Sequence, residues 1–127
     1  MRITIPIDVE DEVRKALSPY ITTYCRPLPK DFKKPSILVT KVGGVETDTI
    51  YQHRVSIDAR ALTEAEADET LRIAIGILKE TAALQTTPLS HITVNSSGSW
   101  GADPVRPDIC MCSATLEVVA HGKNVEV

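Results

Sequence analysis

The segment from Ile50 to Arg60 constrains the fold more than any other part of the chain. Two kinds of side chain alternate along it, which is typical of a β-strand with one buried face and one face in water. The expected buried face carries Tyr51, His53, Val55, Ile57 and Ala59, and the expected wet face carries Gln52, Arg54, Ser56, Asp58 and Arg60. Such a strand requires neighbouring strands and an apolar layer against one of its sides.

A helix that could supply this layer is predicted from Thr63 to about Leu84. Thr63 and Glu66 have the spacing of a capping box, in which each side chain satisfies the backbone amide of the other residue. The apolar face of this helix consists of Ala67, Leu71, Ala74, Ile75 and Leu78. Burial of its three largest side chains should stabilise the domain by about 2 kcal/mol each, before conformational entropy is subtracted.

The remaining elements are shorter. We expect a first helix that starts at Asp8, whose carboxylate can accept hydrogen bonds from the first turn, and that stops at Pro19. Further strands are predicted at Tyr20–Arg26, Ser36–Val42, His91–Asn95 and Cys110–Ala120, with a tight turn at Gly43-Gly44 and a loop from Ser96 to Asp108. The order α-β-β-β-α-β-β predicts one α+β domain over residues 1–127, with two helices packed on one face of a mostly antiparallel sheet.

A basic loop is predicted between Arg26 and Pro35, where three prolines cannot donate to a sheet ladder. Its basic residues are Arg26, Lys30, Lys33 and Lys34, in a chain whose formal net charge is −3. We expect this loop to project and to contact an acidic partner or passing DNA, and a solvated loop is the alternative. Trp100 lies in the second loop, where it either packs on its own domain or anchors a partner.

Cysteine and histidine residues are the candidates for metal or thiol chemistry. Cys110 and Cys112 share one face of a predicted strand, which could form half of a zinc site. The same face continues with apolar residues, so we predict two buried, metal-free thiols instead. A small metal- or thiol-dependent enzyme that uses Cys110, Cys112 and His53 is the alternative. We assign no catalytic residue, metal or cofactor.

The net charge, the number of cysteines and the lack of a secretory signal or a membrane-spanning run limit the functional classes that we expect for this chain. A formal net charge of −3 argues against a dedicated nucleic-acid binder, which normally has a basic excess. The odd number of cysteines suits a reducing cytoplasm, and the first residues do not form a secretory signal. No apolar run approaches the roughly 20 residues that cross a bilayer, so no membrane contact is expected. These features predict a protein that is made in the cytoplasm.

Several segments of the chain resemble tail terminator (tail-to-head joining) proteins of phages with long, non-contractile tails. The segment Pro6–Glu10 is similar to the opening of these proteins, and Arg26–Gly44 is similar to their proline-bounded loop and following strand. The segments Arg54–Arg60 and Thr63–Asp68 resemble the strand and helix at their centre. The loop around Ser97–Pro107, followed by the last strand, looks like their closing segment.

The resemblance implies a structural role in the virion, at the head-proximal end of the tail tube. Members of this family form a ring that is expected to contain six subunits, stops tube polymerisation and offers a surface for head joining. The implied partners are other copies of the chain, the major tail tube protein and the head–tail connector protein. Another neck or head-completion protein is the alternative of the same class. The resemblance assigns no residue of this chain to either the tube or the head.

Overall fold

The computed structural model describes residues 1–46 and 51–127 of the chain. The main sheet has the strand order β2-β3-β4-β6-β5. Its strands are β2 (Thr23–Cys25), β3 (Ser36–Glu46), β4 (Tyr51–Ala61), β5 (Leu89–Ala102) and β6 (Cys110–Ala120). Only the short pairing of β2 with β3 is parallel among the described strands, and the other neighbours are antiparallel. The predicted start of β4, Ile50, lies outside the described residues.

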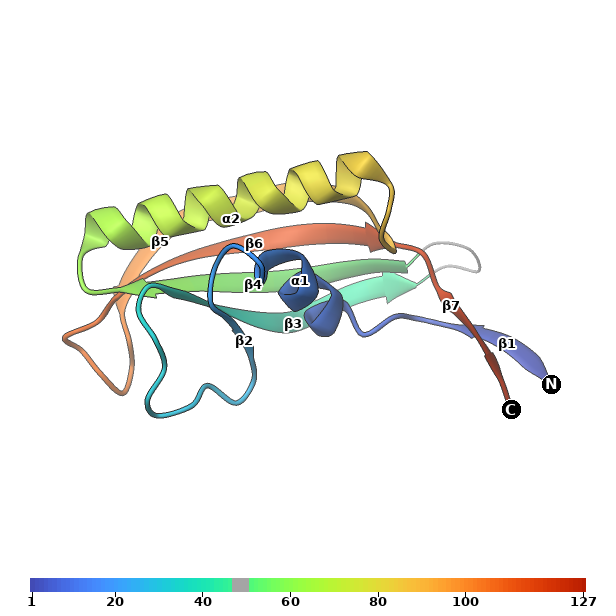
Figure 1. The fold of residues 1–127 in the computed structure, drawn as a ribbon, viewed down its shortest axis with the longest axis horizontal. Coiled ribbons are helices and arrows are strands. Elements are labelled where there is room, and N and C mark those ends of the chain that lie inside the picture. The colour runs from blue at the N-terminus through green and yellow to red at the C-terminus, as the bar shows by residue number, and fades with distance from the viewer. Residues whose placement is uncertain (47–50) are drawn as a thin grey trace.

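The two helices, α1 (Val9–Leu17) and α2 (Glu64–Leu84), cover one face of this sheet (Figure 1). Both begin where the sequence predicts. The Asp8 carboxylate accepts a hydrogen bond from the Asp11 amide at 3.2 Å, and the Thr63 hydroxyl accepts one from the Glu66 amide at 3.2 Å. The predicted α+β fold is therefore confirmed. Neither helix in the described part of the chain combines the length and the apolar character that a bilayer crossing requires.

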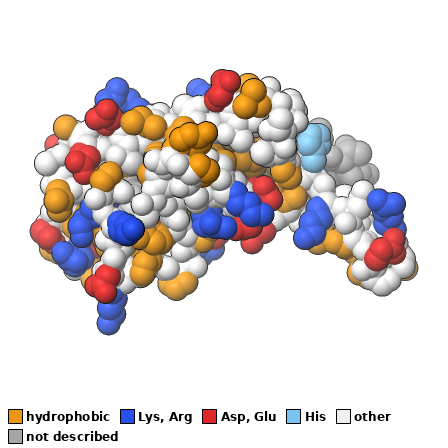
Figure 2. All heavy atoms as spheres, viewed as in Figure 1, with side chains coloured by type: hydrophobic (Ala, Val, Ile, Leu, Met, Phe, Trp, Pro, Cys, Tyr) orange, Lys and Arg blue, Asp and Glu red, His pale blue; other side chains and the backbone are white. Residues whose placement is uncertain are grey.

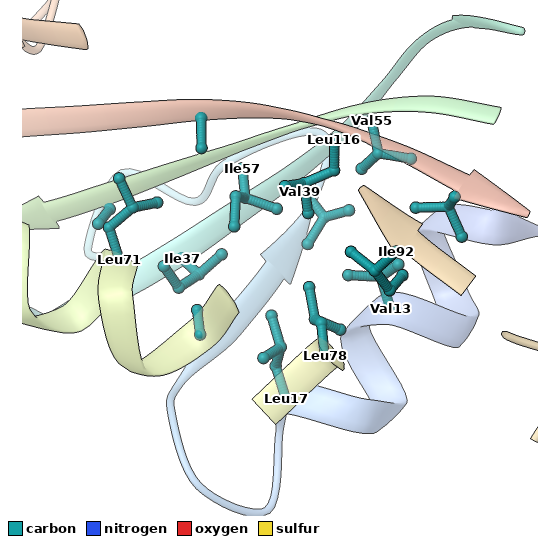
Figure 3. Packing of buried hydrophobic residues seen from close by; sticks show 14 of the residues in the cluster. Val13, Leu17, Ile37, Val39, Val55, Ile57, Leu71, Leu78, Ile92 and Leu116 are labelled. Carbon is teal, nitrogen blue, oxygen red and sulfur yellow. The ribbon is translucent and has the colours of Figure 1, made fainter. Parts of the chain in front are cut away.

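The hydrophobic core lies between the helices and the covered face of the sheet (Figure 3). The alternation along β4 places Val55 opposite Leu116 and Ile57 opposite Ala114 of β6, and all four residues are buried. The helices add Val13, Leu17, Leu71 and Leu78, which point toward the same strands. Of the predicted apolar face of α2, only Ile75 is partly rather than fully buried.

Two predicted boundaries are wrong, because strands continue through them. β3 does not turn at Gly43-Gly44 but runs on to Glu46, with an irregularity in its pairing between Lys41 and Gly43. Glycine is required at position 44, because a Cβ there would collide with the carbonyl oxygen of Gln52 on β4. β5 likewise extends to Ala102 through three irregularities in its pairing, so much of the predicted second loop is strand.

A second, two-stranded sheet was not predicted. It consists of β1 (Arg2–Ile5) and β7 (Lys123–Glu126), which pair in antiparallel fashion. The short segments carry no long alternation, so the sequence pattern does not distinguish them from loops. In Figure 1 this terminal ribbon extends away from one end of the body, beyond β6. The remaining predicted strand, Tyr20–Arg26, is shorter in the structure, where β2 covers only Thr23–Cys25.

Candidate functional site

The face of the sheet opposite the helices is polar, and its side chains form hydrogen-bonded groups. Arg54 Nε donates to Glu117 at 2.9 Å, and Asn95 donates to the same carboxylate oxygen at 2.8 Å. Two rows further along the same face, the Ser113 hydroxyl donates to Asp58 at 2.6 Å. We call this surface the open face, because neither helix covers it.

A cleft of about 690 Å³ lies at one end of the open face, between two loops. Loop 26–35 contributes Leu28 and Phe32, and loop 103–109 contributes Val105. The floor of this loop cleft is formed by Leu38 of β3 and Arg60 of β4, which belong to the open face. In Figure 1 both loops lie on the side of the sheet that faces away from α2. The lining is mainly apolar, with charged side chains among the apolar ones.

A buried ion pair joins the sheet to loop 103–109 at this cleft. Arg60 Nε donates to Asp103 Oδ2 at 2.7 Å, and the side chains are only 8% and 5% exposed. The other oxygen of Asp103 accepts the backbone amides of Val105 and Arg106, each at 2.9 Å. Asp103 therefore fixes the start of the loop and neutralises Arg60 at the same time.

The environment of Asp103 favours its charged form. Burial alone raises the pKa of this carboxyl, but the hydrogen bonds from Arg60, Arg106 and Val105 outweigh burial and hold the pKa below its usual range. The carboxylate is therefore ionised at neutral pH. Such a group serves as a fixed negative partner for Arg60 rather than as a general acid.

The guanidinium of Arg60 retains one donor that its surroundings do not satisfy. Its Nη1 atom is buried, and no acceptor among the described residues forms a hydrogen bond with it. Buried polar atoms are normally paired, and an unpaired one costs about 1–3 kcal/mol. Because Arg60 lines the cleft, an acceptor supplied there by another molecule would remove this deficit.

The predicted basic residues do not form one patch. Lys30 lines the loop cleft, whereas Lys33 and Lys34 line a separate hollow beside Tyr20. The Lys34 ammonium lies 5.0 Å from the centre of the Phe32 ring, and Phe32 is buried. Figure 2 shows the Lys and Arg side chains of the viewed face spread among acidic and hydrophobic ones. Phe32 thus anchors the loop, whereas Lys30 and Lys33 remain exposed, and contact of this loop with a partner stays a prediction.

Arg26 is directed toward the first helix. It donates to Glu10 Oε2 at 2.8 Å, and the same oxygen accepts the backbone amide of Lys41 at 2.8 Å. Burial raises the pKa of Glu10, but the bonds from Lys41 and Arg26 outweigh it and leave the pKa lowered. Arg26 therefore has a partner within the domain.

Trp100 lies on β5 rather than in the predicted loop. It pairs with Cys112 of β6, so its side chain emerges on the helix-covered face of the sheet. β5 is an outer strand of the sheet, and Trp100 remains 49% exposed. The loop cleft, in contrast, belongs to the open face, on the other side of the sheet.

A second apolar surface runs along the outside of α2. Tyr20, Ile73 and Leu84 are 73%, 48% and 62% exposed and line a groove of about 400 Å³. Gly76 lies in the same helix groove, and the space above it is open. Hydrophobic side chains are visible over the helices in Figure 2. Contiguous exposed apolar residues of this kind mark protein contacts more often than isolated ones.

The cysteines and His53 do not come together. Cys112 is fully buried, and burial raises the pKa of its thiol, but Cys110 at the end of the strand is only half-buried, contrary to the prediction. Ala59 lies opposite Cys112, and His53 lies farther along β4 by a distance of roughly 20 Å. Within residues 1–46 and 51–127, no group of three or more His, Cys, Asp or Glu residues could hold a metal.

The sequence did not indicate the pairing of Arg60 with Asp103, because 43 positions separate the two residues. Asp103 alone carried a usable signal, since an aspartate before proline in a Gly/Pro-rich segment is typical of a turn. The chain matches no protein-family model, and a search of curated proteins also gives no match.

Proposed function

We propose that this chain is a structural protein of a phage virion that caps the head-proximal end of the tail tube. In this role it stops tube polymerisation and offers a surface for head joining. The resemblance of its sequence segments to tail terminator proteins motivates the proposal. The structural observation that supports it is the presence of different exposed surfaces on one small domain: the loop cleft, the helix groove and the terminal ribbon.

Different surfaces on one chain permit heterologous contacts. In such a contact, one surface of a subunit meets another surface of its neighbour, and the arrangement closes into a ring when the rotation allows it. In Figure 1 the two loops that line the cleft and the terminal ribbon lie toward opposite ends of the long axis, so successive subunits could be joined end to end. The resemblance implies a ring of six subunits.

The partners that we propose are other copies of this chain, the major tail tube protein and the head–tail connector protein. The finished virion is the proposed location. DNA would pass such a ring, and the exposed Lys30 and Lys33 are suited to a non-specific contact with phosphates. We propose these contacts without assigning a particular surface to the tube or to the head.

Deletion of the gene from the phage that encodes this chain tests the proposal. We expect tails of abnormal length that fail to join heads, and electron microscopy of lysates would measure both properties. Re-supplying the wild-type chain should restore tail length and joining. Tails of normal length that join heads normally without this protein would refute the terminator function.

The same experiment separates the alternative in the assembly class. A different neck or head-completion protein would leave tails of normal length, with only head joining lost. The enzymatic alternative gains no support from the arrangement of Cys110, Cys112 and His53, because His53 lies far along β4 from the cysteines. Metal analysis of the purified protein tests that alternative independently.

A further inference from the structure

We infer that the loop cleft binds an extended segment of a partner protein in which an acidic residue is flanked by bulky apolar residues. The inference rests on the proposed assembly function only for the class of occupant, a protein rather than a small molecule. The chemistry of the segment follows from the cleft itself.

The apolar part of the occupant follows from the lining. Leu28, Phe32, Leu38 and Val105 present hydrocarbon surface from two loops and one strand. Val105 is 85% exposed, so its side chain is available for contact with another molecule. A peptide that places one or two large apolar side chains here would remove this surface from water.

The acidic part follows from the charge. The lining contains Lys30, Arg60 and Arg106 but only Asp31 and Asp103 as acidic residues, and Asp103 is already paired with Arg60. Arg106 has a weak, exposed contact with Asp108 at 3.5 Å. A positive balance therefore remains at the cleft of an otherwise acidic protein, and it favours a carboxylate in the occupant.

Arg60 supplies, in addition to its charge, a hydrogen-bond donor whose orientation is fixed. Its Nη1 donor is buried and unsatisfied among the described residues, whereas its Nε is held by Asp103. A carboxylate that accepts a hydrogen bond from Nη1 would complete the hydrogen bonding of the guanidinium. Asp103 would act as a positioning residue that holds the planar guanidinium of Arg60 in place. Neighbouring atoms cover Nη1 in this structure, so engagement requires a small local shift of the atoms around the guanidinium.

The test uses the purified full-length chain and an array of immobilised pentapeptides. Each peptide has glycine at both ends, a central Asp, Glu, Asn, Gln or Lys, and Leu, Ile, Val, Phe or Gly on either side of it. We expect binding to peptides with a central acid and apolar flanks, and weaker binding to their amide counterparts. Absence of this preference in the wild type would overturn the inference.

Variants connect the preference to the cleft. Arg60→Lys keeps the charge but loses the planar fork, so it should weaken binding of the acidic peptides about tenfold. The double variant Lys30→Ser/Val105→Ser changes two exposed residues, should fold normally, and should weaken binding severalfold. Lys79→Ser, on the outer part of α2, is the matched control and should bind as the wild type does. Unchanged binding in both cleft variants would contradict the inference.

A competition experiment separates a peptide from a small amphipathic acid. Octanoate carries the same two chemical features, a carboxylate and an apolar chain. We expect it to compete only weakly, because it lacks the second apolar flank and the peptide backbone. If octanoate displaces the peptides at equal concentration, the occupant is a small carboxylate and the protein-segment inference is wrong. Either result leaves the tail-length experiment unaffected, so failure of the two proposals can be told apart.

Discussion

The two faces of the main sheet are stabilised in different ways. On the face covered by the helices, residues such as Val55, Ile57 and Leu116 share one continuous apolar core. On the open face, the same strands carry separate polar groups, and the Arg60–Asp103 pair is the deeply buried ion pair among the described residues. The stability of the covered face is therefore distributed over many contacts, whereas we expect that of the open face to depend mainly on one ion pair.

This difference separates the residues that specify the fold from the residues that are available for binding a partner. A distributed apolar core is closed to partners, and its residues specify the fold. The open face keeps its polar groups near solvent and has a cleft where two loops meet Arg60. The assembly function that we propose would need both properties, because it requires a rigid unit that still offers a surface to its partners.

The largest effect is expected from breaking the ion pair. Asp103→Ala leaves the guanidinium of Arg60 buried without its partner and removes the oxygen that accepts two loop amides. We expect the free energy of unfolding to fall by about 3–5 kcal/mol. Urea denaturation of the variant measures this loss.

The double variant Arg60→Met/Asp103→Leu is the control for this prediction. It removes both charges and should be more stable than Asp103→Ala, because no uncompensated charge remains. If Asp103→Ala lowers the free energy of unfolding by less than about 1 kcal/mol, the open face does not depend on this ion pair. The contrast between the two faces would then be wrong.

The next effect is expected on the covered face. Leu116→Ala removes a fully buried side chain from the core and should lower the free energy of unfolding by about 3 kcal/mol. Thr115→Ala, the neighbouring position on the open face, should change it by about 0.5 kcal/mol or less. Denaturation of both variants under one set of conditions tests the contrast. Similar losses in the two variants would show that the faces are not stabilised differently.

The smallest effect is a dependence on pH. The pKa of Asp103 is lower in the folded chain than in the unfolded chain, so its contribution is fully present above about pH 4 and is lost as pH falls through the folded-state value. The loss is smaller than that in Asp103→Ala, because a protonated carboxyl still forms hydrogen bonds. Asp103→Asn has no titrating carboxyl at this position. The free energy of unfolding of this variant should therefore decline less steeply than that of the wild type below about pH 4. Parallel curves in urea denaturation between about pH 5 and 3 would contradict the assignment to Asp103.

The covered face could be predicted from the sequence because its pattern is local. Alternation along Tyr51–Ala61 and the cap at Thr63 identify the central strand and the main helix without knowledge of their neighbours. The boundaries at Gly43-Gly44 and beyond Asn95 could not be predicted, since glycine occurs both in turns and in strand irregularities. Only the pairing with a neighbouring strand distinguishes a turn from a strand irregularity at these positions.

The candidate site was only partly predictable. The alternation placed Arg60 on the correct face, and composition identified loop 26–35 as basic, but neither showed that loop 103–109 buries Arg60. The basic residues were expected to act together, yet the structure directs Arg26 to Glu10 and separates Lys30 from Lys33 and Lys34. Contacts between residues far apart in sequence determine these outcomes, and spacing along the chain does not encode them.

The hydrogen bond between Glu10 and the Lys41 amide has a consequence for self-association. β2 pairs with β3 only as far as Val39, so the outer edge of β3 beyond that point has no partner strand in the described sheet. A bare edge is a template onto which a strand of another molecule can add, and repeated addition leads to aggregation. Here the carboxylate of Glu10, held by Arg26, occupies the first such amide. A charged side chain thus takes the place of a strand at this amide, and it should reduce edge-to-edge association between copies of the chain.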